Sequence, residues 1–127
     1  MLKKKSRKQL VKSLDKSFSE YIRARDKNTC VTCRSTRNST CGHLFSRTSY
    51  STRWNTKNAF CQCWGCNYRH EFDSYPLTMH FISVYGKVAY DDLHAEYVIP
   101  VKYKDYQLEE MIEYYRNQKK ALDKHDK

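Results

Sequence analysis

The stretch that decides the fold reads Cys30-Val-Thr-Cys33 at its start, Gly42-His43 inside it, and Asn58-Ala-Phe-Cys-Gln-Cys63-Trp-Gly-Cys66-Asn67 at its end. Four thiolates in two Cys-x-x-Cys pairs suit the tetrahedron that Zn²⁺ adopts in closed structural sites. We therefore predict that one structural Zn²⁺ is bound by Cys30, Cys33, Cys63 and Cys66. The gap between the pairs exceeds that of a simple zinc ribbon, which indicates a functional insert.

Two other uses of these cysteines compete with zinc binding: a redox-active Cys-x-x-Cys and disulfide bonds. A redox motif usually lies near a βαβ pattern, which this sequence lacks. No signal-peptide pattern follows the basic N-terminus, and no stretch has the roughly 18 apolar residues of a membrane helix. We therefore expect a cytoplasmic protein with reduced thiols and no membrane partner. Cys41 and Cys61 are expected to be small buried residues, although Cys61 could replace Cys63 as a ligand.

The composition favours one small domain that a metal stabilises. Only 39% of the 127 residues are hydrophobic, and the mean hydropathy is −0.92, so the apolar core is thin. Within one compact domain we distinguish a basic tail and helix at 1–27, a zinc-knuckle core at 28–75 and a helical segment at 76–127.

Apolar residues at helical spacing predict a helix before this core. Leu10, Leu14, Phe18 and Ile22 recur every four residues, and Ser6 can cap the start of the helix. The core itself is rich in Ser, Thr, Asn and Cys and lacks helical periodicity, as expected for hairpins and loops around a metal.

Three further helices are predicted after the core. Pro76 can open the first of them and Gly86 can end it, and a short helix covers Val88 to Tyr97. Asp105 can cap the last helix. The apolar residues of this last helix fall at near-heptad spacing, which suits either packing on its own domain or a homodimer face; they are Leu108, Met111, Ile112, Tyr115 and Leu122.

Positive charge gathers in the N-terminal third. The net charge is +10, of which residues 1–40 contribute +9. Such an arm either binds phosphates or serves as a solvated tail, and we favour phosphates because the basic residues continue to the cysteines. The candidate DNA-binding residues are Lys3, Lys4, Lys5, Arg7, Lys8, Arg34, Arg37, Arg47, Arg53 and Arg69.

The insert carries residues suited to phosphodiester hydrolysis, which needs a base for water and a cation for the phosphate. His43 can be the base, because neutral imidazole accepts a proton near pH 7. The side-chain oxygen of Asn67 can bind a hard cation such as Mg²⁺. Asn58 is suited to orienting His43 through hydrogen bonds around its loop. Taken singly, each of these residues is more often structural.

The register of these residues resembles an HNH endonuclease of the ββα-metal (His-Me finger) class. It is most similar to the NinG/Rap family of phage recombination endonucleases, which act on branched DNA. The matching parts span roughly residues 15–124 and include Tyr21-Ile-Arg-Ala-Arg-Asp26, Cys41-Gly-His-Leu44, Arg53-Trp54, Asn58 to Asn67, Val84-Tyr-Gly86 and the last helix.

The resemblance implies an α+β fold, a zinc-stabilised ββα-metal (HNH) core between an N-terminal helix and C-terminal helices. It makes His43 the general base, Asn58 the residue that braces the hairpin, and Asn67 a ligand of a catalytic Mg²⁺ or Mn²⁺. Many relatives carry Asp before the His, where this chain has Gly42. Glu71 offers hard oxygens as a tentative second ligand, with His70 as a rival.

Three functions therefore compete. The first is a structure-selective endonuclease that cuts Holliday junctions, flaps or D-loops during phage recombination in the host cytoplasm. The second is a less selective HNH nickase or DNase. The third is a non-catalytic zinc module that binds nucleic acid. A homodimer would favour the first function, because resolving a symmetric junction takes two active sites.

Overall fold

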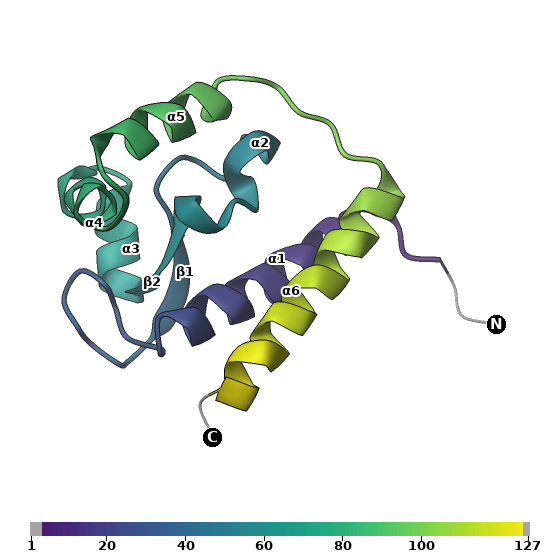
Figure 1. Cartoon of the computed structure of the whole chain (residues 1–127), viewed down its shortest axis with the longest axis horizontal. Coiled ribbons are helices and arrows are strands. Elements are labelled where there is room, and N and C mark those ends of the chain that lie inside the picture. Colours follow the sequence, from purple (N-terminus) through teal and green to yellow (C-terminus); the bar gives the residue numbers. More distant parts are fainter. Residues whose placement is uncertain (1–3, 126–127) are drawn as a thin grey trace.

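The computed structural model describes residues 4–125, and it has the α+β class that the sequence predicts (Figure 1). The described part is mostly helical, with one small two-stranded sheet. Its helices and strands are, in order, α1 (Arg7–Arg25), β1 (Ser39–His43), α2 (Tyr50–Arg53), the 3-10 turn η1 (Thr56–Asn58), β2 (Ala59–Cys63), α3 (Trp64–His70), α4 (Tyr75–Tyr85), α5 (Lys87–Tyr97) and α6 (Asp105–His125).

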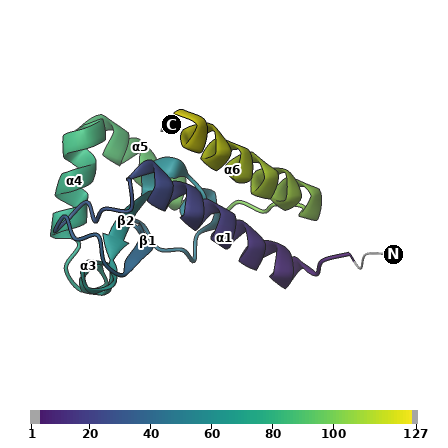
Figure 2. The ribbon, with the colours of Figure 1, turned by 90° about the horizontal axis from the view of Figure 1, so that it is seen from below.

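Helix α1 forms where the apolar repeat predicts it. The Ser6 hydroxyl accepts from the Gln9 backbone N–H, and the Gln9 side chain accepts from the Ser6 N–H, which makes a complete capping box. Leu14, Phe18 and Ile22 are buried on the face that α6 covers. The two helices run side by side in the same direction (Figures 1 and 2).

The apolar side of helix α6 packs against the rest of the same chain. Leu108, Ile112 and Tyr115 are buried against α1, and the Tyr115 hydroxyl donates to the Trp54 carbonyl at 2.6 Å. Asp105 is the first residue of α6 and not the predicted cap, and its carboxylate accepts from Arg7 at 2.9 Å. This ion pair ties the starts of α1 and α6 together. The residues considered for a dimer face are thus largely covered by the chain itself.

Strands β1 and β2 pair antiparallel, with Cys41 opposite Cys61 and His43 opposite Ala59. Because side chains alternate along a strand, Ala59 joins the core under α1, while Phe60 joins a second core with Leu77 and Phe81 of α4. A lone hairpin is marginally stable in water, so these two cores supply the burial that it needs.

Arg25 and Asp26 clamp the end of α1 to β2. The Arg25 guanidinium donates to the carbonyls of Thr56 and Ala59, both at 2.8 Å. The Asp26 carboxylate accepts from the Cys61 N–H at 2.8 Å. The hairpin therefore has a fixed position relative to α1.

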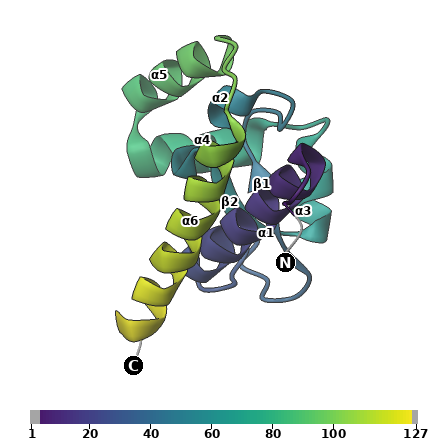
Figure 3. The same ribbon diagram turned by 90° about the vertical axis from the view of Figure 1, so that its right-hand side faces the viewer.

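Helices α4 and α5 follow the predicted start and stop signals. Pro76 lies in the first turn of α4, and Gly86, with φ of 92°, ends α4 before α5 begins. Figure 3 shows this helix pair at the end of the molecule away from the C-terminal end of α6. Between residues 4 and 125, no helix is both long and apolar enough to cross a membrane. Helix α2, which is only one turn long, was not predicted from the sequence.

Candidate functional site

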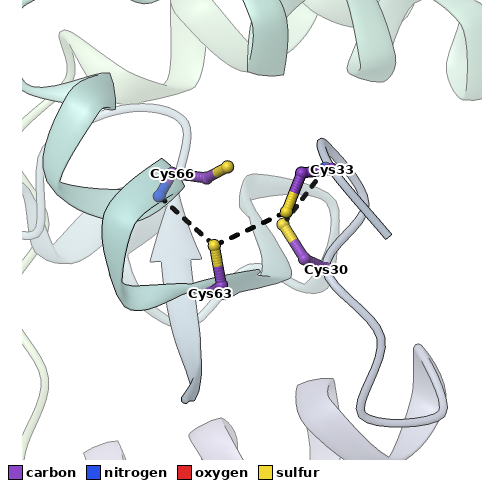
Figure 4. A group of neighbouring side chains, drawn as sticks. All are labelled: Cys30, Cys33, Cys63 and Cys66. Atoms are coloured by element: carbon purple, nitrogen blue, oxygen red, sulfur yellow. Dashed lines mark hydrogen bonds between the residues drawn. The ribbon is translucent and has the colours of Figure 1, made fainter. Parts of the chain in front are cut away.

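The four predicted cysteines come together from two distant parts of the chain (Figure 4). Their sulfur atoms all lie within 4.8 Å of one another, and those of Cys33 and Cys63 are 3.7 Å apart. A tetrahedral zinc with Zn–S bonds of about 2.3 Å requires sulfur separations of about 3.8 Å. The donor set and its spacing thus fit a structural zinc ion, as the sequence predicts.

Backbone hydrogen bonds shape both halves of this knuckle. The Cys33 N–H donates to the Cys30 sulfur at 3.5 Å, and the Cys66 N–H donates to the Cys63 sulfur at 3.4 Å. Each pair is thus a tight turn that aims both thiols inward (Figure 4). The knuckle joins the loop after α1 to the junction of β2 and α3.

Without a bound cation, the four thiols of the knuckle differ in how readily they ionise. Burial would raise the pKa of Cys30, but backbone N–H groups outweigh burial and lower it to about 7. Burial and the neighbouring Cys63 thiol raise the pKa of Cys66. Four adjacent thiolates need a cation to neutralise them, which a bound Zn²⁺ would supply. Outside the knuckle, burial raises the pKa of Cys41 to about 12 and that of Cys61 to about 11, so both thiols are unreactive near pH 7.

His43, the last residue of β1, is held in one tautomer. Its Nε2 lies 2.8 Å from the Arg53 carbonyl oxygen, which can only accept, so Nε2 carries the hydrogen. The lone pair is therefore on Nδ1, which is buried and has no hydrogen-bond partner among residues 4–125. Burial lowers the pKa of His43 to about 4, despite the opposing bond to Arg53. The ring is neutral near pH 7 and keeps a basic nitrogen.

Arg53 takes part in this arrangement through an ion pair. Its guanidinium donates to the Asp15 carboxylate at 2.6 Å, and the Trp54 indole donates to the same carboxylate at 2.9 Å. These bonds fix the backbone whose carbonyl holds His43. The side chain of Arg53, predicted as a DNA contact, is thus largely buried and engaged with α1. Sequence reasoning missed Asp15, which lies far from the insert along the chain.

Asn58 is buried and uses its amide to brace the loop between the strands. Its Nδ2 donates to the carbonyls of Phe45 and Thr52, both at 3.0 Å. Its Oδ1 accepts from the Phe45 N–H at 2.8 Å. All of its hydrogen bonds therefore hold the loop that follows His43.

A chain of hydrogen bonds sets the orientation of Asn67. The Thr40 hydroxyl donates to the Gln62 carbonyl at 2.8 Å, so it must accept from Asn67 Nδ2, 2.9 Å away. The Asn67 Oδ1 then has no hydrogen-bond partner among residues 4–125 and can bind a cation. Thr40 was not singled out from the sequence, because nothing local marks it.

His43 and Asn67 line the same groove. Two hollows of about 500 Å³ and 640 Å³ share Cys41, His43, Arg47 and Asn67. The first hollow extends along α1, and the second reaches Glu71 near the end of α3. The tentative ligand Glu71 is thus exposed on the groove that holds Asn67.

Its rival, His70, has Nε2 bonded to the Leu44 carbonyl at 2.9 Å. By the argument used for His43, that nitrogen carries the hydrogen. Its other ring nitrogen is buried without a hydrogen-bond partner in the described part of the chain. His70 therefore anchors α3 to the loop after β1.

Gly42 leaves room for a buried side chain. A Cβ at this position would lie 2.0 Å from the Gln62 amide oxygen, and Gln62 is itself fully buried. An aspartate before His43 would therefore require the Gln62 side chain to shift.

The other candidate DNA contacts lie on the surface. Arg34 and Arg37 are exposed in the loop of the knuckle and form no ion pair within residues 4–125. Arg47 pairs with Asp15 at 3.1 Å and Arg69 with Asp73 at 2.9 Å, and both remain about half exposed. At the N-terminus, Lys4, Lys5, Arg7 and Lys8 are exposed, whereas Lys3 lies outside the described residues.

Fold and site together define a small α+β protein with a four-cysteine knuckle beside a histidine–asparagine groove. The family model described as "Bacteriophage Lambda NinG protein" matches residues 1–126, so the chain belongs to the NinG family. Neither the curated proteins nor the solved structures include a match to it.

Proposed function

We propose that this protein is a metal-dependent DNA endonuclease. The observation that carries the proposal is that His43 and Asn67 line the same groove. Within residues 4–125, the buried Nδ1 of His43 and the amide oxygen of Asn67 each have no hydrogen-bond partner. A module that only bound zinc and nucleic acid would need neither.

In this mechanism His43 Nδ1 removes a proton from a water molecule, and the water oxygen forms a bond to phosphorus while the P–O3′ bond breaks. The Arg53 carbonyl stabilises the imidazolium that forms, because it accepts from Nε2–H. Asn67 Oδ1, with Glu71 as a tentative second ligand, would hold a Mg²⁺ or Mn²⁺, which neutralises charge on the phosphate and on the departing oxygen. Position 42 contributes no ligand.

The charge distribution supports DNA as the substrate. The chain carries a net charge of +10. The exposed Arg34 and Arg37 closely follow the knuckle cysteine Cys33 in the sequence. Negative charge is densest where DNA strands converge, so a strongly basic protein gains most at branch points. A branch also bends over a single metal at less deformation cost than straight duplex.

Membership of the NinG family, together with the HNH resemblance, favours a structure-selective enzyme of phage recombination in the host cytoplasm. A dimer remains part of this proposal as the source of paired nicks. It would need a surface other than the covered stripe of α6.

The test is cleavage of a panel of fixed-sequence oligonucleotides with Mg²⁺ or Mn²⁺. We expect four-way junctions, flaps or D-loops to be cut at least several-fold faster than matched linear duplex. Equal rates on all shapes, with sequence-dependent cut sites, would indicate the nickase alternative. Binding without any cleavage under these conditions would indicate the zinc-module alternative.

Thr40 gives a sharper test of the metal ligand. Thr40→Val keeps the shape of the side chain but leaves the amide of Asn67 without the acceptor that orients it. We expect the Mg²⁺ concentration for half-maximal cleavage to rise by about 10-fold or more, as for other residues that position metal ligands. Thr40→Ser should restore the wild-type value. An unchanged requirement for Mg²⁺ in Thr40→Val would mean that Asn67 does not bind the catalytic metal.

A further inference from the structure

Three exposed aromatic side chains form a continuous row along α3 and the turn that follows it. Trp64, Tyr68 and Phe72 follow one another at four-residue spacing, and 64%, 54% and 71% of their surfaces are exposed. The Trp64 and Tyr68 rings stack with centroids 5.5 Å apart and planes 3° apart. The Tyr68 and Phe72 rings meet edge to face at 5.6 Å. We call these three residues the aromatic ladder.

The fold leaves the ladder uncovered because α3 packs through other residues. Asn67 bonds to Thr40 of β1, and His70 bonds to the carbonyl of Leu44. Exposing several large aromatic surfaces to water is unfavourable, and such patches usually mark a binding surface. Cys63 caps α3 and Cys66 lies in its first turn, so the row of rings begins directly beside the knuckle.

Positive charge next to the ladder indicates what it binds. The backbone N–H of Trp64 donates to the Asn38 carbonyl at 2.9 Å, which joins the start of the ladder to the loop of the knuckle. That loop presents Arg34 and Arg37, both exposed and without an ion pair within residues 4–125. Flat exposed rings beside unpaired cations are the combination that binds single-stranded nucleic acid, through base stacking and phosphate contacts.

The ladder also lies beside the candidate active site. Tyr68 directly follows Asn67 in α3, so the two side chains leave the helix on neighbouring sides. Because a helix with its side chains is only about 10 Å wide, they lie close together. Bases within an intact duplex are stacked on one another and cannot reach protein rings. We infer that the aromatic ladder binds unpaired bases next to the cleaved phosphate, which makes DNA with unpaired nucleotides at a branch the substrate class. This inference rests on the proposed nuclease function.

The test compares binding of two labelled DNAs of the same sequence, one fully paired and one with a single-stranded arm. Fluorescence anisotropy is measured without added Mg²⁺ or Mn²⁺, so no cleavage is required. Tyr68→Ala and Phe72→Ala should each weaken binding to the armed DNA by about 10-fold, the usual contribution of one stacked base. Their binding to paired duplex should change by less than about twofold.

Matched substitutions separate stacking from general apolar contact. Tyr68→Phe should keep wild-type affinity because it keeps the ring, whereas Tyr68→Leu should bind as weakly as Tyr68→Ala. Tyr106→Ala removes an equally exposed aromatic ring from α6 and should have no effect. The emission of Trp64 should also be quenched by the single-stranded arm, since the other tryptophan, Trp54, is buried.

Equal losses on armed and paired DNA, or full affinity in Tyr68→Leu, would overturn the inference. So would ladder variants that bind DNA normally but turn a dimer into a monomer in sedimentation experiments, because the ladder would then be an interface between copies. The two proposals fail separately. Selective loss of armed-DNA binding in a protein that cuts no DNA would refute only the nuclease. Cleavage that ladder variants leave unchanged on every DNA shape would refute only the ladder.

Discussion

Replacing His43 by alanine should slow DNA cleavage by at least about 10²-fold, the low end for loss of a general base. The substitution removes the ring nitrogen, His43 Nδ1, that takes the proton from water in the proposed mechanism. DNA binding should be largely retained, since a neutral His43 contributes no charge to phosphate contacts. Single-turnover cleavage and binding of the same labelled junction measure the two effects.

His94→Ala is a suitable control, because His94 is exposed on α5 and does not line the groove. It should cleave at the wild-type rate, and both variants should keep the zinc content of the wild type. Full nuclease activity in His43→Ala would exclude the HNH mechanism and favour the zinc-module alternative.

The pKa of His43 should also set the pH dependence of the cleavage rate. Burial lowers the pKa of His43 from 6.5 to about 4, so the unprotonated base persists as the pH falls through 6.5 and is lost only near 4. The acidic limb of the single-turnover profile should therefore have its midpoint near pH 4. A midpoint near 6.5 would contradict the assignment of the buried His43 as the acting base.

Cys66→Ser or Cys30→Ser should abolish stable folding near physiological temperature. Structural zinc sites contribute about 10–16 kcal/mol of apparent binding free energy, which equals or exceeds the entire stability of a typical domain, about 5–15 kcal/mol. Here the knuckle joins the loop after α1 to the end of β2, and a hairpin without such support is marginal. Thermal unfolding by circular dichroism, with elemental analysis of the purified protein, measures both consequences.

The wild type should contain close to one zinc per chain and lose its cooperative transition when the metal is removed. Cys41→Ser is the matched control. Cys41 lies on β1 near the knuckle in sequence but is not one of the four clustered cysteines, so this variant should keep its zinc and most of its stability. A cooperative fold that persists in the zinc-free protein would refute the structural role of the knuckle.

Elements with local causes can be predicted from the sequence alone. The four-residue apolar repeat and Ser6 specify α1, while Pro76 and Gly86 specify the ends of α4. Burial periodicity and capping act within a few residues, so they can be read directly from a sequence. The cysteine spacing likewise predicted the four-thiol cluster, because two Cys-x-x-Cys pairs supply the four thiolates of a tetrahedral zinc site.

The orientation of the side chains in the candidate site depends on contacts between distant parts of the chain. The hydrogen on His43 is set by the carbonyl of Arg53, and that backbone is held by Asp15 from α1. The free oxygen of Asn67 depends on Thr40 of β1. Hydrogen bonds are directional and short, so they depend on strand register and helix packing between residues far apart in the chain. For the same reason Arg53, predicted as a surface cation, is instead the largely buried ion-pair partner of Asp15 in α1.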